Sequence, residues 1–386
     1  MHRYHRLGNV PPKRHTALRR PDGQLFYEEL IGNRGFSGPS SLIHHLRMPT
    51  AILASEMVKT VKPEAGPNRD LRNRHFDTGK VTTGPSLTLD RMPLLFNSDV
   101  TLSLARPTAT DAAFARNGQA DEILYVAEGQ GMLESAFGDI VYRPGDYVVV
   151  PRGVVHRFVL GEGPHRYLVF ESGDYVRAPR RYRGDHGQLL EGAPYSERDF
   201  RLPENLRTRD ETGSFSIIVK AHDSLTRITL GHHPFDAVGW DGYYYPFAFS
   251  IHDFEPRVGR THLPPPVHQT FEAAGYVICS FCPRPYDFDK DAIPAPYAHT
   301  NAMSDEVIFY ASATFMSRKG VSFGSITLHP DGLPHGPQPG RTEASVGARW
   351  TDELAVMLDT FKPLQVAKGF LDAEDPAYWR SWTATS

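Results

Sequence analysis

Short runs of apolar residues, bounded by glycine, proline or aspartate, recur along the chain, whereas apolar spacing typical of a helix is scarce. Such a pattern predicts a protein of β-strands joined by turns, as in sandwiches and barrels. Helix is predicted only at Gly38–Leu46 and in the tail near Pro376–Trp382. The predicted strands are Glu122–Val126, Tyr147–Val150, Arg166–Phe170, Ser214–Val219, Tyr276–Phe281, Val307–Tyr310, Ser325–Leu328 and Leu354–Leu358.

One β-rich unit occurs twice, about 180 residues apart. Asp121–Tyr125 resembles Asp305–Tyr310, and each is followed by the pattern P-x-G-x-x-H, which ends at His156 and at His335. Glu122 precedes its histidine by 34 residues and Glu306 precedes its own by 29. Two copies of one unit fit the length of 386 residues better than unrelated domains.

Both copies resemble the cupin signature, in which an acidic residue precedes a glycine-rich turn and a histidine follows on a later strand. The first copy matches well, while the second has Ala313 where a glycine is expected. The resemblance implies an all-β fold of two cupin-type jelly-roll barrels. We expect an N-terminal domain over residues 1–235, with its barrel core at about 96–175, and a C-terminal barrel over 236–386.

Composition excludes several classes of protein. No stretch of about 18 uncharged apolar residues exists, so a membrane span is not expected. A net charge of −3 gives no general attraction for nucleic acid. Without a secretory signal and with only two cysteines, a reducing cytoplasm is expected. Cys279 and Cys282 form a C-x-x-C on a predicted strand, where residues three apart point to opposite faces, so a redox or zinc site is disfavoured.

The count of 18 histidines raises the question of a metal site. His299 lies seven residues before Glu306, so the second copy can offer His299, Glu306 and His335. Two imidazoles and one carboxylate form the facial triad of non-haem Fe(II) enzymes, although zinc or manganese could use the same ligands. Asp305 is the rival carboxylate, but it alternates to the other strand face. These histidines could also be hydrogen-bonded turn residues.

The first copy has no equivalent of His299, because the nearest histidine before Glu122 is His75, 47 residues away. We therefore predict that the first barrel holds no metal and that His156 is structural. Near the second copy, His268 follows three prolines, whose rigidity would hold it in a fixed place. A fixed histidine that is not a ligand suits acid/base work on a phenol. A structural role is equally open for His268 and for His329.

Several segments are similar to the homogentisate 1,2-dioxygenase family in its shorter bacterial form. The C-terminal motifs are specific, and the resemblance extends over nearly the whole chain. The similarity is weaker in the N-terminal part, at Tyr27–Gly32 and Phe36–Gly38. The segments that carry it are His233–Gly242, Tyr245–Phe249, Pro296–Ser304 and Leu328–Pro337.

The resemblance implies a ring-cleaving dioxygenase that uses Fe(II) and O2 to convert homogentisate to maleylacetoacetate, in tyrosine and phenylalanine catabolism. It also suggests a homo-oligomer, a trimer or a hexamer. Three positions depart from the animal enzymes: one extra residue separates His299 from the acid, Asp241 replaces a histidine and Phe315 replaces a tyrosine that contacts substrate. The implied site has His299, Glu306 and His335 as iron ligands, His268 as acid/base, and His329, Tyr297 and His335 near the substrate.

Three other functions stay open from the sequence. A cupin dioxygenase for gentisate or another hydroquinone would share the site but differ in substrate. A metal-dependent cupin isomerase would consume no O2. A non-enzymatic bicupin would bind no metal, and the presence of a complete triad in one copy only argues against it.

Overall fold

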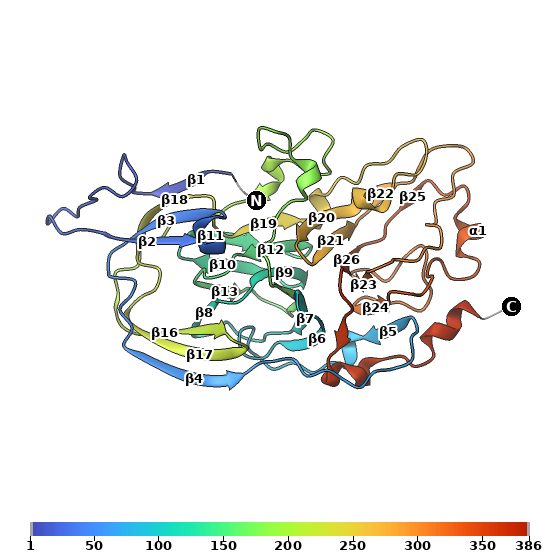
Figure 1. Cartoon of the computed structure of the whole chain (residues 1–386), viewed down its shortest axis with the longest axis horizontal. Helices are drawn as coiled ribbons and strands as arrows, with labels where there is room; N and C mark the ends of the chain where they lie inside the picture. The colour runs from blue at the N-terminus through green and yellow to red at the C-terminus, as the bar shows by residue number, and fades with distance from the viewer. Residues whose placement is uncertain (1–2, 384–386) are drawn as a thin grey trace.

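The computed structural model describes residues 3–383, and nearly all of its regular structure is β-strand (Figure 1). Within that range the only α-helix is α1 (Arg341–Ser345). This confirms the expected all-β class. No helix of the described residues is long and apolar enough to cross a membrane. The remaining helices are short 3-10 turns: η1 (Arg34–Phe36), η2 (Thr78–Lys80), η3 (Arg180–Tyr182), η4 (Glu197–Asp199), η5 (Ile251–Asp253), η6 (Pro265–His268), η7 (Lys368–Ala373) and η8 (Tyr378–Trp382).

Two large sheets form the N-terminal half and enclose an apolar core that includes Leu124, Val148 and Phe158. The first has the strand order β11 (Gly138–Tyr142), β10 (Gly131–Ser135), β13 (His156–Leu160), β8 (Phe114–Asn117), β16 (Thr212–Ala221), β17 (Ser224–His232) and β4 (Ala54–Thr60). The second has the order β15 (Phe200–Arg201), β19 (Phe247–Ser250), β12 (Asp146–Val150), β9 (Asp121–Glu128), β14 (Arg166–Ser172), β7 (Val100–Ala105), β6 (Met92–Phe96) and β27 (Gln365–Val366).

A four-stranded sheet adds to this half, with the order β1 (His5–Gly8), β18 (Ala237–Gly242), β3 (Ser40–His45) and β2 (Tyr27–Gly32). Strand β3 corrects the prediction of a helix at Gly38–Leu46. It pairs on both sides, and all of its residues but the first are buried. Its sequence, Ser-Ser-Leu-Ile-His-His, does not alternate apolar and polar residues, because polar side chains are buried on both faces, and so the period that marks a strand is absent. The tail does form a helical turn, η8.

The C-terminal half contains one large sheet, with long loops and a small ribbon beside it (Figure 1). The ribbon pairs β22 (Arg284–Pro285) with β25 (Trp350–Thr351). Phe315, from the loop after β23, packs on one face of the large sheet. The large sheet has the order β20 (Gln269–Ala273), β21 (Tyr276–Phe281), β26 (Ala355–Thr360), β23 (Asp305–Tyr310), β24 (Ser325–His329) and β5 (Arg74–Asp77).

The two halves share one core between the eight-stranded and the six-stranded sheets. Tyr125 of β9 lies against Phe309 of β23, with ring centroids 6.1 Å apart. The hydroxyl of Tyr147 lies 2.8 Å from Oγ of Ser280 across the same interface. The halves also exchange edge strands, because β5 completes the C-terminal sheet and β27 completes the N-terminal one.

This exchange bears on the expected domain division. Strands β18 and β19 follow residue 235 in the chain but pair with N-terminal sheets. The chain enters the six-stranded sheet at β20, after η5 and η6. The boundary at residue 235 stays a prediction.

Candidate metal centre

Glu306 is the second residue of β23, and strand alternation decides which way its side chain points. Val307 and Phe309 belong to the core shared by the two halves, whereas Ile308 and Tyr310 pack on the opposite face. Glu306 lies on the face of Ile308. The oxygens of Asp305 instead accept backbone amides of the loops after β24 and β26, at 2.8 and 2.7 Å. The structure therefore brings Glu306, not Asp305, towards the histidines.

The two predicted ligand histidines lie on neighbouring loops. His299 and His335 form an isolated antiparallel bridge, with both backbone N–H···O bonds at 2.8 Å. A Cβ on Gly336 would lie 2.6 Å from Cα of Ala298, so only glycine allows the two loops to approach this closely. The P-x-G-x-x-H turn places its glycine at φ +86° in both copies of the unit, at Gly153 and Gly332.

Three ligand atoms converge on one point. Nε2 of His299 lies 3.9 Å and Nε2 of His335 lies 3.5 Å from Oε2 of Glu306, and all three atoms fall within 4.8 Å of one another. On each ring, Nδ1 lies 3.3 Å from the carbonyl oxygen two residues earlier in the chain. Donation by Nδ1–H to these carbonyls leaves the Nε2 lone pairs free for a metal. The buried Nε2 of His335 has no hydrogen-bond partner. This donor set fits Fe(II), zinc or manganese.

His329 lies behind the triad and contacts its carboxylate. Register pairs it with Glu306 across the sheet, and its Nδ1 lies 2.6 Å from Oε1 of Glu306. Burial disfavours ionisation of Glu306, but the hydrogen bond from His329, together with the nearby imidazoles of His329 and His335, holds its pKa well below the usual value. Burial lowers the pKa of His329 to about 4, so a neutral imidazole faces an ionised carboxylate. His329 is fully buried, and its predicted substrate contact stays a prediction.

Asp359 is a neighbour of the site that sequence reasoning missed. It lies on β26 directly opposite Glu306. Burial, together with the charge of Glu306, raises its pKa well above the usual value. No motif surrounds Asp359 in the sequence, so only the pairing of β23 with β26 reveals it.

The predicted acid/base residue lies farther along the same sheet face. His268 ends η6, and its ring centroid lies 4.7 Å from that of Phe281 on β21. Phe281 pairs with Ala355 of β26, which in turn pairs with Tyr310 of β23. Tyr310 is four residues beyond Glu306, so His268 lies towards the opposite end of β23 from the triad. The buried Nδ1 of His268 has no hydrogen-bond partner. Burial, helped by the charge of Arg284, lowers the pKa of His268 to about 3. Its catalytic role stays a prediction.

Tyr297 lies at the surface beside the triad. Its side chain is 56% exposed, and its ring centroid lies 6.4 Å from that of His299 and 5.2 Å from that of His262. Tyr297 also lines a cavity of about 590 Å³, together with Arg260 and His262. The position is open to a small molecule, and the substrate contact of Tyr297 stays a prediction.

The first copy of the unit retains part of this geometry, with Nδ1 of His156 3.1 Å from the carbonyl of Val154 and its Nε2 3.9 Å from Oε2 of Glu122. His75, the nearest upstream histidine, lies instead in the C-terminal sheet beside Ser325. The guanidinium of Arg91 donates a hydrogen bond to each carboxylate oxygen of Glu122, at 2.6 and 3.0 Å.

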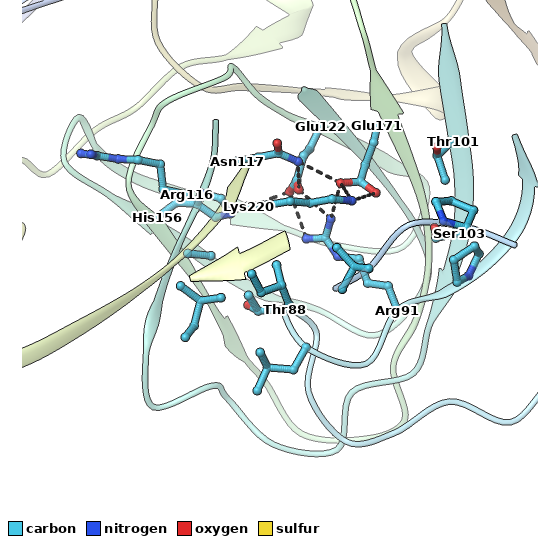
Figure 2. Close-up of a pocket in the computed structure, with 17 residues that line it drawn as sticks. Thr88, Arg91, Thr101, Ser103, Arg116, Asn117, Glu122, His156, Glu171 and Lys220 are labelled. Carbon is cyan, nitrogen blue, oxygen red and sulfur yellow. Dashed lines mark hydrogen bonds and ion pairs between the residues drawn. The ribbon is translucent and has the colours of Figure 1, made fainter. Parts of the chain in front are cut away.

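A closed charge network surrounds that ion pair (Figure 2). Asn117 donates to Glu122 and to Glu171 at 2.9 Å each, and Lys220 donates to Glu171 at 2.7 and 2.8 Å. Burial opposes ionisation of Glu122, yet the charge of Arg91 lowers its pKa to about 2. Among residues 3–383, the second copy alone brings three such ligands together.

The two cysteines lie on opposite faces of the C-terminal sheet, as strand geometry predicts. Cys279 packs with Ile308 on the face of the triad, and Cys282 packs into the shared core. Both are buried free thiols.

Known proteins resemble this chain along most of its length. The family model for the N-terminal part of homogentisate 1,2-dioxygenase matches residues 104–251, before the triad begins. A "Putative dioxygenase" of Saccharolobus solfataricus is 40% identical over 98% of both chains. The homogentisate 1,2-dioxygenases of Bradyrhizobium diazoefficiens and Rhodopseudomonas palustris are 29% identical, over 65% and 64% of this chain and 58% and 57% of their own.

Solved structures match more weakly. A cupin 2 conserved barrel domain protein from Leptotrichia buccalis covers 80% of this chain and all of its own, at 11% identity and a TM-score of 0.36. The glyoxylate-induced protein of Pseudomonas aeruginosa covers 78% of this chain and 96% of its own, at 12% identity and the same TM-score.

Proposed function

Since this chain belongs to the homogentisate 1,2-dioxygenase family, we propose that it is an Fe(II)-dependent dioxygenase that opens the ring of homogentisate with O2 to give maleylacetoacetate. The reaction belongs to tyrosine and phenylalanine catabolism. The observation that carries the proposal is the convergence of His299, Glu306 and His335 on one point.

The triad residues have defined roles in this proposal. Nε2 of His299, Nε2 of His335 and the carboxylate of Glu306 would hold the iron from one side, which leaves coordination positions for substrate and O2. Iron bound there would supply the redox chemistry with dioxygen. His329 keeps the carboxylate of Glu306 oriented through its hydrogen bond.

His268 is the proposed acid/base residue. Its ring is neutral at pH 7, and its buried Nδ1 has no protein partner, so this nitrogen is free to accept a hydrogen bond from a substrate hydroxyl. Tyr297 is proposed to contact the aromatic substrate, because it lies beside His299 and lines the adjoining cavity. His329 and His335 are proposed to lie at the substrate's metal-binding end.

Three substitutions test these roles. His299→Ala and Glu306→Ala are expected to abolish both iron content and O2 uptake on homogentisate. His268→Phe is expected to retain iron and lose turnover. His186→Ala, at an exposed histidine, is the control and should behave as wild type. Full activity in the triad variants or in His268→Phe would reject the assignment.

A related substrate is the second candidate. Phe315, where the animal enzymes have a substrate-contacting tyrosine, is buried against Tyr310 with ring centroids 5.0 Å apart. Loss of that hydroxyl would suit gentisate or another hydroquinone. O2 uptake across a panel of hydroquinones separates the two candidates. A cytoplasmic location and a trimer or hexamer remain part of the proposal.

A further inference from the structure

Arg318 is a buried cation that the proposed chemistry does not use. It lies on the loop between β23 and β24, and only 4% of its side chain is exposed. Its Nη1 donates to the carbonyl of Gly336 at 2.9 Å. Gly336 directly follows the ligand His335 in the chain. The guanidinium lies 5.7 Å from the ring centroid of Trp382, whose indole N–H donates to the same carbonyl at 3.2 Å. Arg318 is thus packed against the loop that carries His335.

This guanidinium differs from other well-buried arginines of the chain in having no acidic partner. Arg74, Arg91 and Arg284 each place a guanidinium nitrogen 2.6 to 2.7 Å from a glutamate oxygen. Arg318 forms no ion pair with any carboxylate among residues 3–383, and its Nε has no hydrogen-bond partner. Neutral acceptors hold the guanidinium instead: the carbonyl and hydroxyl of Ser317, at 3.3 and 3.2 Å, and the carbonyl of Gly336. The protein therefore leaves this buried positive charge without a counter-charge in direct contact, an arrangement that costs several kcal/mol.

The charges around Arg318 identify where an anion would bind. Burial lowers the pKa of Arg318, but the Tyr310 and Tyr378 hydroxyls and then the carboxylate of Glu306 raise it, and its hydrogen bond to Gly336 places it next to the ligand His335. A divalent cation held by the triad would share the carboxylate of Glu306. The cation and Arg318 then carry three positive charges against the single negative charge of Glu306. Asp359 could supply at most one more negative charge, and its pKa is raised.

We propose that Arg318 makes this site select an aromatic ligand that bears a carboxylate over an uncharged hydroquinone of similar shape, because it keeps an unneutralised positive charge beside the metal-binding triad. Arg318 acts here as a positioning residue through its charge. The class of substrate, a hydroquinone, is taken from the proposed function. Arg318 is the residue that would distinguish charged from uncharged members of that class.

The test measures equilibrium binding of 2,5-dihydroxyphenylacetate and of its methyl ester to the metal-loaded full-length protein without oxygen. The wild type should bind the acid about tenfold more tightly than the ester. Arg318→Gln, which removes the charge and keeps a polar side chain, should lower affinity for the acid about tenfold and change affinity for the ester less than about twofold. Arg318→Lys, which restores the charge, should recover most of the difference.

Metal content is measured on every variant to separate a charge effect from a structural one. Arg74→Gln is the matched control, because it removes a buried arginine that pairs with Glu374 away from the triad and should leave the ratio of the two affinities unchanged. Equal loss of acid and ester, or loss of metal in both Arg318 variants, would overturn the proposal. So would a wild type that binds acid and ester equally. A wild type that prefers the acid but consumes no O2 would leave the role of Arg318 standing and reject the proposed reaction.

Discussion

His329 has the shortest side-chain contact with the metal-binding triad, 2.6 Å from Nδ1 to Oε1 of Glu306. Groups that orient a metal ligand through a hydrogen bond commonly change metal affinity 10–100-fold when removed. We expect His329→Leu to lower iron affinity by about 10–100-fold with the fold intact, measured by competition with a chelator. His75→Leu, at a buried histidine of the adjacent strand, is the control. Unchanged affinity in His329→Leu would contradict this role.

His45 should make stability depend on pH. It is buried between Asp236 and Glu29, at 2.7 and 3.2 Å. Burial favours the neutral ring, but hydrogen bonds to the two carboxylates outweigh it and raise the pKa to about 9. Because the folded pKa lies above the unfolded value, this stabilisation is complete below pH 6.5 and is lost as pH rises through 9. The size of the effect is about 3 kcal/mol.

Denaturant unfolding between pH 6 and 10 measures the effect of His45. The wild type should lose stability across this interval, and His45→Gln should show a flatter profile. The exposed His186→Gln variant should follow the wild type. A His45→Gln profile parallel to that of the wild type would show that His45 does not carry the dependence.

At the residue scale, the sequence predicted the residues that motifs mark and missed those that only the fold brings in. The spacing of the cupin-like motif and the family resemblance together predict His299, Glu306 and His335, and the cupin offset with strand alternation favours Glu306 over Asp305. Arg91 lies 31 residues before Glu122, and Arg318 is on a loop without any motif. Their roles depend on contacts with distant parts of the chain, which a local pattern does not contain.

At the scale of elements, the eight predicted strands all coincide with observed strands, because each is a short apolar run bounded by turn residues. Strand β3 was assigned to the wrong class, since burial on both faces removes the alternation that marks a strand. The short strands β5 and β27 could not be predicted. Each is stabilised by pairing with the opposite half, which is a property of the tertiary fold.

The first copy of the β unit should acquire metal binding if its internal cation is removed. Arg91→Met leaves the buried Glu122 without its cationic partner, which should cost about 3–5 kcal/mol of stability in metal-free buffer. Glu122, His156 and Glu171 would then face a cavity that can take a divalent ion. We expect zinc to restore part of the lost stability and metal content to rise from about one to about two ions per chain.

Arg106→Met is the matched control for that experiment, because Arg106 donates only to backbone carbonyls. It should bind no additional metal. If Arg91→Met still binds a single ion per chain, the guanidinium does not take the place of a metal in the first copy.

At the scale of the whole molecule, the two copies of the β unit hold their glutamates differently: Arg91 pairs with Glu122 in the first, whereas Glu306 faces His299 and His335 in the second. The N-terminal sheets lie beside the sheet that carries Glu306 (Figure 1). Tyr125 and Tyr147 contact that sheet through the apolar core that the two halves share. Glu306 points to the opposite face of that sheet, where the paired loops of His299 and His335 complete the triad. The first copy thus packs against the face of the C-terminal sheet that is opposite the triad.

Anaerobic reconstitution with Fe(II), followed by O2 uptake on homogentisate, tests the central claim most directly. We expect about one iron per chain, because the described residues form a single triad, and about one O2 consumed per homogentisate. Both quantities should disappear in Glu306→Ala. Iron-loaded protein that consumes no O2 with homogentisate would contradict the account.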